Sequence, residues 1–162
     1  KIQKWLSEIF KSCSGLIGIG GKTNELDDYY QCYRQALQTL NILSGNRTSK
    51  NYAFFEDLGS YTLLHLIKDT TEAHYFMKNY IEKLLIYSKK NNINLFQTLR
   101  VYLEQNGSIK NTSEKLFIHR STLLYRLERI KEILELDIDD SDIRFNLMMT
   151  YKLYDLKEEK PH

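Results

Sequence analysis

The chain has 162 residues, a formal net charge of +2 at pH 7, 27% charged residues and 42% hydrophobic residues. This length is enough for one domain, or two small ones, with a real core. Because the net charge is small, any basic surface for a polyanion has to be local. The sequence shows no signal peptide and no apolar run of about 18 residues, so we expect a cytoplasmic protein without a membrane partner.

The beginning of the chain and its cysteines predict little chemistry. Apolar residues recur at helical spacing from the first turn on (Ile2, Trp5, Leu6, Ile9, Phe10), so we expect a helix here and a chain that is a piece of something longer. Cys13 and Cys32 form no Cys-x-x-Cys pair and no cluster with histidine. We therefore expect two reduced thiols, and neither a disulfide nor a metal site.

The segment GLIGIGGKT, Gly15 to Thr23, is similar to a phosphate-binding loop. The Gly-x-x-x-x-Gly-Lys-Ser/Thr spacing fails because Leu16 stands where the first glycine belongs. The dinucleotide spacing fails because Thr23 takes the place of its last glycine. We favour a strand end and turn. A nucleotide-binding enzyme that uses Gly15–Thr23 is the less favoured alternative, and we assign no catalytic residue and no cofactor.

Helical periodicity dominates the rest of the chain, whose one proline is Pro161, and it predicts a mainly α protein. We expect a buried strand at Leu16–Ile19. Asn24 is then predicted to cap a helix that carries an apolar stripe. The side chains of this stripe are expected to lie in the core. The stripe consists of Leu26, Tyr29, Tyr33, Leu37 and Leu40.

Three further elements are expected before the middle of the chain. Tyr52–Phe55 is aromatic-rich and predicts a second strand. Ser60 is a plausible cap for a short helix that ends at Ile67. Thr70 or Thr71 opens a long helix to about Lys90, with apolar side chains at helical spacing that are expected in the core (Phe76, Tyr80, Leu84, Tyr87).

The sequence KKNN, Lys89 to Asn92, interrupts the periodicity and indicates a domain junction. Residues 1–58 mix helix and strand patterns, residues 59–91 are expected to be connecting helices, and residues 92–162 contain no convincing strand. The predicted fold is therefore a C-terminal helical bundle preceded by a partial α+β segment.

The pattern after Leu95 is short helix, turn, short helix, tight turn and longer helix. Leu95, Leu99, Tyr102 and Leu103 line the first helix, and Gln105–Ser108 ends it. Ile109–Leu116 gives a second helix of about two turns. Phe117–Ile130 makes a turn and enters a third helix that runs to about Leu134. Two short helices and a tight turn before a longer basic helix form a helix-turn-helix arrangement.

The third helix separates two kinds of residue. At about 100° per residue, its leucine and isoleucine positions form one stripe, which is expected to pack (Leu123, Leu127, Ile130, Leu134). Polar and basic positions form another stripe, which is expected to face outward (Thr122, Tyr125, Arg126, Arg129). Phe117–Lys131 carries four basic and one acidic residue, 4 − 1 = +3, whereas Asn92–His162 sums to 11 − 12 = −1. This local positive charge suits a helix in the major groove of DNA.

The residues of this region carry a family resemblance. The stretch LFIHRSTLLYRLERI, Leu116 to Ile130, resembles the core of the C-terminal helix-turn-helix domain of the PucR/CdaR family of bacterial transcription regulators. The resemblance continues through LELDIDDSDIR and covers nearly all of Asn94–Leu156. It implies a transcription regulator that binds double-stranded DNA. The alternative is a helical protein-interaction module whose basic stripe meets an acidic partner.

The resemblance also implies which residues contact DNA. The turn is similar to that of the Fis protein, in which an Arg and a Thr at the start of the recognition helix contact DNA, and these correspond to Arg120 and Thr122. Leu124 stands where many relatives carry Arg, which implies one contact fewer. For His119 we favour capping of the helix or a phosphate contact over catalysis, because no metal partner is at suitable spacing. The predicted DNA-binding set is His119, Arg120, Ser121, Thr122, Tyr125, Arg126 and Arg129.

Upstream, the segments LIGIGG, ELDDYYQCYRQALQTL and NYAFFEDL resemble the closing strand, helix and strand of a degenerate GGDEF-like domain. The Gly-Gly-Asp/Glu-Glu-Phe turn of a working cyclase is absent. The family's small-molecule effector is then expected to bind a domain that this chain lacks. We also expect a homodimer, and we expect the last helix to serve packing or dimerisation (Ile143, Leu147, Tyr151, Tyr154).

Overall fold

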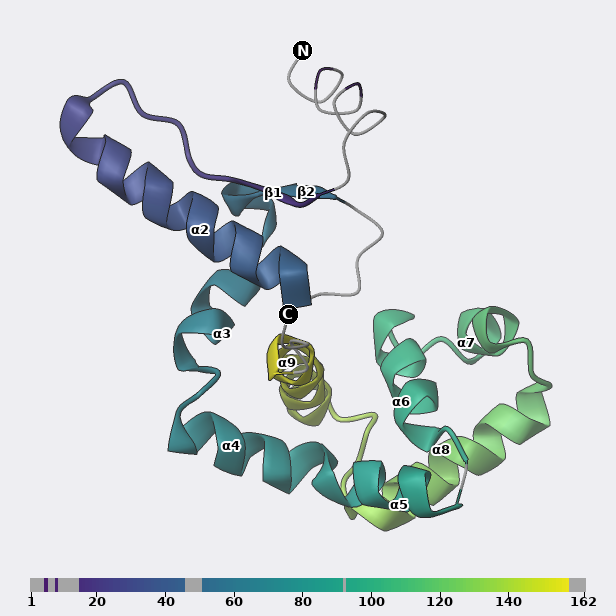
Figure 1. The fold of residues 1–162 in the computed structure, drawn as a ribbon. Coiled ribbons are helices and arrows are strands. Elements are labelled where there is room, and N and C mark those ends of the chain that lie inside the picture. The colour runs from purple at the N-terminus through teal and green to yellow at the C-terminus, as the bar shows by residue number, and fades with distance from the viewer. Residues whose placement is uncertain (1–4, 6–7, 9–14, 46–50, 92, 158–162) are drawn as a thin grey trace. The chain divides into compact units, whose positions relative to one another are not determined.

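The computed structural model describes Trp5, Glu8 and residues 15–45, 51–91 and 93–157 (Figure 1). The described residues fall into two compact units. Unit 1 comprises those up to Lys68 together with those from Asp155 on, and unit 2 is Asp69–Tyr154. The helix expected at the N-terminus lies largely outside the described residues. The division at residues 58 and 91 stays a prediction.

Unit 1 contains a two-stranded parallel sheet. β1 (Ile17–Ile19) pairs with β2 (Tyr52–Phe54), with Ile17 opposite Tyr52 and Ile19 opposite Phe54. Parallel strands require a crossover connection, and the helix α2 (Tyr29–Gly45) provides it and packs on both strands. Both expected strands are confirmed, although β1 is half-buried rather than buried. The remaining elements are two 3₁₀ turns (Leu26–Asp28, Phe55–Asp57) and α3 (Tyr61–Ile67).

Two details of α2 differ from expectation. Asn24 does not cap it, because a 3₁₀ turn precedes α2 and Glu25 stands at that turn's N-cap position. The hydroxyl of Thr23 accepts a hydrogen bond from the Glu25 amide (3.0 Å), so a threonine turn opens the segment.

Four of the five residues of the apolar stripe predicted for the first crossover helix are exposed, contrary to the prediction, and the fifth, Leu40, is half-buried. Leu26, Tyr29 and Tyr33 are 85%, 59% and 60% exposed, and Leu37 is also exposed. The helix instead buries the side that carries Thr39, Ile42 and Leu43. Tyrosine rings expose a polar tip on a largely apolar body, and spacing alone did not reveal which of the two sides meets the strands.

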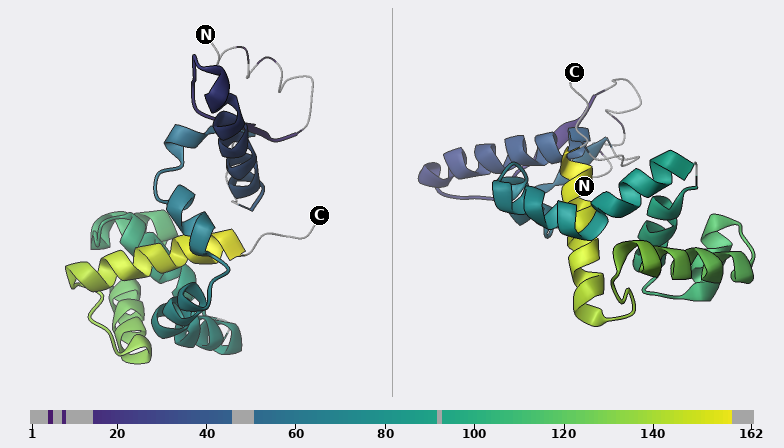
Figure 2. Two further views of the ribbon diagram at one scale, coloured as in Figure 1. Left: turned by 90° about the vertical axis from the view of Figure 1, so that its left-hand side faces the viewer. Right: turned by 90° about the horizontal axis from the view of Figure 1, so that it is seen from below.

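Unit 2 consists of helices, as expected (Figures 1 and 2). The long helix predicted from Thr70 or Thr71 is present, and Thr70 caps it by accepting a hydrogen bond from the Ala73 amide (3.2 Å). A π turn interrupts it between α4 and α5. The helices are α4 (Thr71–Met77), the π turn (Lys78–Glu82), α5 (Lys83–Asn91), α6 (Leu95–Glu104), α7 (Ile109–Leu116), α8 (Arg120–Leu134) and α9 (Ser141–Lys157), which extends past the end of the unit.

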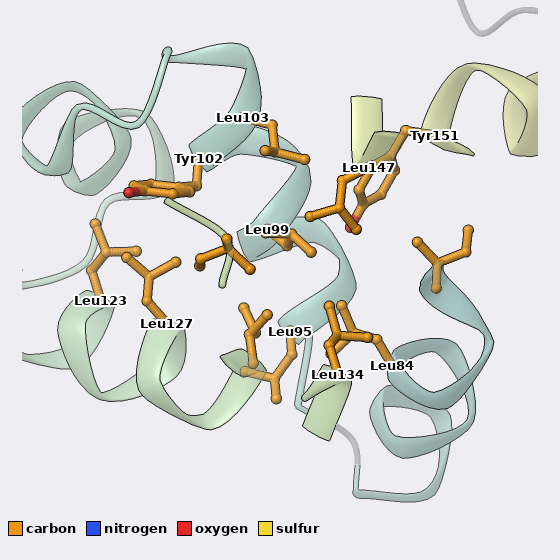
Figure 3. Packing of buried hydrophobic residues seen from close by; sticks show 13 residues of the cluster. Leu84, Leu95, Leu99, Tyr102, Leu103, Leu123, Leu127, Leu134, Leu147 and Tyr151 are labelled. Atoms are coloured by element: carbon orange, nitrogen blue, oxygen red, sulfur yellow. The ribbon is translucent and has the colours of Figure 1, made fainter. Parts of the chain in front are cut away.

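The core of unit 2 lies between α5, α6, α8 and α9 (Figure 3). The four apolar residues predicted for α6 are buried, and so are the four predicted for α8. On α9, Leu147 and Tyr151 belong to the core while Ile143 and Tyr154 pack against it, so the predicted packing role of this helix is confirmed. The core includes Ile81, Leu84, Leu95, Leu99, Tyr102, Leu103, Leu123, Leu127, Ile130, Leu134, Ile138, Leu147 and Tyr151. The mainly α fold with a helix-turn-helix bundle is confirmed.

Candidate nucleic-acid interface

The helices α7 and α8 are joined by a tight turn. The hydroxyl of Ser108 accepts a hydrogen bond from the Asn111 amide (3.3 Å) and caps α7. At the other end of α7, Phe117 adopts φ +54° in the left-handed region, and the amide of Ile118 donates to the Ser113 carbonyl (3.1 Å). This left-handed residue ends α7 and lets the chain reverse into α8 within three residues.

His119 caps α8, as predicted. It is extended at the N-cap of α8, and its Nδ1 accepts a hydrogen bond from the Ser121 amide (3.3 Å). The same nitrogen lies 2.7 Å from the Ser121 hydroxyl oxygen. The ring remains exposed at the point where the first amides of α8 are unpaired within the helix, which is where an anion is stabilised. Among the described residues, no group of His, Cys, Asp and Glu could hold a metal ion.

The N-terminal half of α8 presents its polar side chains to the outside. Arg120, Ser121, Thr122 and Tyr125 are all exposed, with Tyr125 at 72%. Three of these residues carry hydroxyl groups and one carries a guanidinium group, so together they offer donors for phosphate oxygens and for base edges.

Arg126 and Arg129 depart from the predicted outward stripe, because both are half-buried. Arg126 donates from Nη1 to the hydroxyl of Thr98 on α6 (3.2 Å). Thr98 is fully buried. The predicted stripe therefore faces outward at Thr122 and Tyr125, whereas Arg126 lies along the flank and ties α8 to α6.

Arg129 is engaged by α5. Its Nε donates to the hydroxyl of Tyr87 (3.3 Å), and its guanidinium carbon lies 5.2 Å from the centre of the Tyr87 ring. Its Nη1 also donates to Glu132 (2.6 Å). These hydrogen bonds raise the pKa of Arg129 above its ordinary value. The bond to Tyr87 has the larger effect and the bond to Glu132 the smaller one. The pair with Glu132 is three residues apart, whereas no local pattern in the sequence indicates the contact with Tyr87, which is 42 residues away.

A polar network holds the other end of α8. The carboxylate of Asp139, in the loop between α8 and α9, accepts from the hydroxyl of Tyr102 (2.6 Å) and from Nζ of Lys131 (2.7 Å). The Lys131 ammonium lowers the pKa of Asp139, and the Tyr102 hydroxyl adds to this effect. Burial, together with the hydrogen bond to Asp139, raises the pKa of Tyr102 to about 12. Sequence reasoning did not identify this network, which links α6, α8 and the following loop.

The glycine-rich segment in unit 1 has a packing role. A Cβ at Gly18 would meet the backbone of Ala36 and Leu40, and one at Gly20 would meet the Cys32 carbonyl oxygen. The amide of Gly21 donates to the side chain of Gln35 (2.8 Å). The glycines thus let β1 approach α2 closely, and one amide that a phosphate loop would need is already bonded.

Comparison with known proteins places the C-terminal region in a family. Residues 95–153 match the PucR C-terminal helix-turn-helix domain. These residues are a PucR-type helix-turn-helix domain. The match begins at the first residue of α6 and ends on α9, so it contains α7, the turn and the whole of α8.

Relatives extend the similarity beyond the PucR-type domain. The chain is 30% identical over 155 residues to the DNA-binding transcriptional activator AdeR of Bacillus subtilis. This alignment covers 93% of this chain and 36% of AdeR. The chain is also 30% identical over 128 residues to the carbohydrate diacid regulator of Escherichia coli, covering 79% of this chain and 32% of the regulator. The chain thus spans about a third of the length of these relatives.

One solved structure is similar as well. The structure of a regulator of polyketide synthase expression from Bifidobacterium adolescentis aligns with a TM-score of 0.44 at 20% identity. The alignment covers 75% of this chain and 49% of the other.

Proposed function

We propose that this chain is the DNA-binding end of a transcription regulator and that α8 enters the major groove of duplex DNA. The observation that carries the proposal is that some polar side chains of α8 are exposed to solvent whereas others hold the helix against its neighbours. Its capped N-terminus exposes Arg120, Ser121, Thr122 and Tyr125, while Arg126 and Arg129 tie the helix to α6 and α5. Recognition helices of this type contact base edges with their N-terminal residues.

The seven predicted DNA-contacting residues take two positions in this proposal. The N-terminal residues from His119 to Tyr125 reach phosphates and base edges. Arg126 and Arg129 lie on the flank, where a guanidinium with five N–H groups can hold Thr98 or Tyr87 and still donate to a phosphate.

The proposal is tested by selecting bound sequences from random duplex DNA and measuring affinities by fluorescence anisotropy. Arg120→Ala and Arg126→Ala are each expected to weaken specific binding by roughly 1 to 3 kcal/mol. Lys78→Ala, which removes an exposed charge from the π turn, is the matched control and should leave the affinity unchanged. Wild-type affinity in both arginine variants would refute α8 as the reading helix.

Salt dependence separates this function from a protein-interaction module. Specific DNA binding by a cationic helix falls steeply with salt and exceeds the affinity for scrambled duplex. Equal affinity for both duplexes would favour the interaction module.

Four further features belong to the same proposal. The whole protein acts in the cytoplasm, where bacterial DNA lies, and it binds its effector through a domain outside this chain. It acts as a homodimer whose recognition helices read half-sites about 34 Å apart. Residues 1–58 form the C-terminal part of a degenerate GGDEF-like domain. No helix among the described residues is long and apolar enough to cross a bilayer.

A further inference from the structure

The face of α8 that points away from the core is not the stripe of basic residues. Ser121, Leu124, Tyr125 and Glu128 are all exposed and follow the spacing i, i+3, i+4, i+7, which places them on one side of a helix. Leu124 is 41% and Tyr125 72% exposed, and the Glu128 side chain is 72% exposed. The opposite side carries the buried residues Leu123, Leu127, Ile130 and Leu134.

Leu124 and Glu128 are unsuited to the DNA backbone. A leucine offers phosphate no hydrogen bond, and a carboxylate is repelled by it. Among the described residues, Glu128 pairs with Lys131 at 3.9 Å, which is beyond hydrogen-bonding distance, and its side chain is exposed. Both residues have defined partners on base edges, since thymine alone of the four bases carries a methyl group in the major groove, and a carboxylate accepts from the amino group of cytosine.

Building on the proposed function, we propose that this outward face sets the operator sequence, with Leu124 packing on a thymine methyl group and Glu128 accepting from an exocyclic amino group. Glu128 therefore selects cytosine or adenine and rejects guanine, whose major-groove edge presents acceptors. The two residues are one helical turn apart, about 6 Å. Because base pairs are stacked about 3.4 Å apart, the two contacts lie about two base pairs from each other.

The cationic groups suit the borders of this face. Arg120 lies at the start of α8, beside the exposed ring of His119, and Arg126 lies on the flank against Thr98. Phosphates run along both sides of the major groove while base edges form its floor. An apolar and acidic centre between cationic borders fits that arrangement, so the charge pattern of α8 supports base reading by its centre.

The thymine contact is tested with the selected operator and the whole chain. Each thymine is replaced in turn by uracil, which lacks only the methyl group, and affinity is measured by anisotropy. At one position we expect the affinity to fall about fourfold, which is the effect expected when one methyl-sized group is no longer buried. In Leu124→Ala the same replacement should have no effect. A wild-type scan without such a position, or an unchanged uracil effect in Leu124→Ala, would overturn the thymine contact.

The amino-group contact is tested by repeating the selection from random DNA with variants. Glu128→Ala should accept any base at one position where the wild type takes cytosine or adenine, and Glu128→Lys should shift that position to guanine. Glu82→Ala, at an exposed site on the π turn, is the matched control and should select the wild-type sequence. If both Glu128 variants also select it, the contact is refuted while the proposed function stands. A wild type without sequence preference refutes both.

Discussion

Asp139 links a titratable group to the placement of α8. Its carboxylate holds Tyr102 of α6 and Lys131 of α8 at 2.6 and 2.7 Å. Because these partners lower the pKa of Asp139, the ionised form stabilises the folded protein. That contribution is complete above the ordinary pKa of 3.8 and is lost as the pH falls through the lowered value.

We therefore expect Asp139→Asn to destabilise the chain near neutral pH and to lose this effect in acid. The Asp139 side chain is 53% exposed, so solvent screening limits the difference in unfolding free energy to below about 1 kcal/mol. Urea unfolding followed by circular dichroism in a series from about pH 7 down to about pH 2 measures it. The control Asp69→Asn, at an exposed site in the same unit, should change the unfolding free energy near neutral pH by less than about 0.5 kcal/mol. A gap that persists in acid would contradict the assigned role.

At the scale of elements, α5 belongs physically to the DNA-binding bundle although the family match begins after it, at residue 95. Ile81 in the π turn and Leu84 on α5 are buried in the same core as the residues of α6 and α8. Tyr87 of α5 also holds Arg129 of α8. The preceding helix α5 thus helps to fix the orientation of α8.

Two leucine-sized residues on α5 allow a matched test of this role. Leu84 is 0% exposed and Ile86 is 61% exposed. Leu84→Ala should lower the unfolding free energy by roughly 2 to 5 kcal/mol, since it leaves a cavity in the core. Ile86→Ala should change it by less than about 0.5 kcal/mol. Equal effects of the two changes in urea unfolding would mean that α5 is not part of the bundle.

The sequence could predict α6, α7 and α8 because their signals are local. Ser108 caps α7, Gly107 takes φ +77° in the preceding turn, and the leucines of α8 recur at helical spacing. The half-buried positions of the Arg126 and Arg129 side chains depend instead on Thr98 and Tyr87, which lie on other helices. No local pattern encodes such partners. The outward face of α2 was mistaken for core for the same reason, because spacing shows that a stripe exists and not what covers it.

At the scale of the whole molecule, the glycine-dependent packing and the proposed DNA contacts lie in different units. The glycines of β1 serve packing within unit 1, and the proposed DNA contacts all lie in unit 2. A defect in the strand-to-helix packing should therefore be confined to unit 1. This expectation also bears on the nucleotide-binding alternative, which would make the same glycines part of an active site.

Gly18→Ala tests this separation. Its Cβ would collide with the backbone of Ala36 and Leu40, and backbone atoms cannot give way as a flexible side chain can. We expect faster hydrogen exchange in β1 and α2, with wild-type DNA affinity, because α8 is stabilised by contacts within its own unit. Gly15→Ala is the control, since nothing lies within 4 Å of the added carbon. If DNA affinity fell together with the protection of β1, the integrity of unit 1 would be required for reading DNA, and the independence of the two units would be wrong.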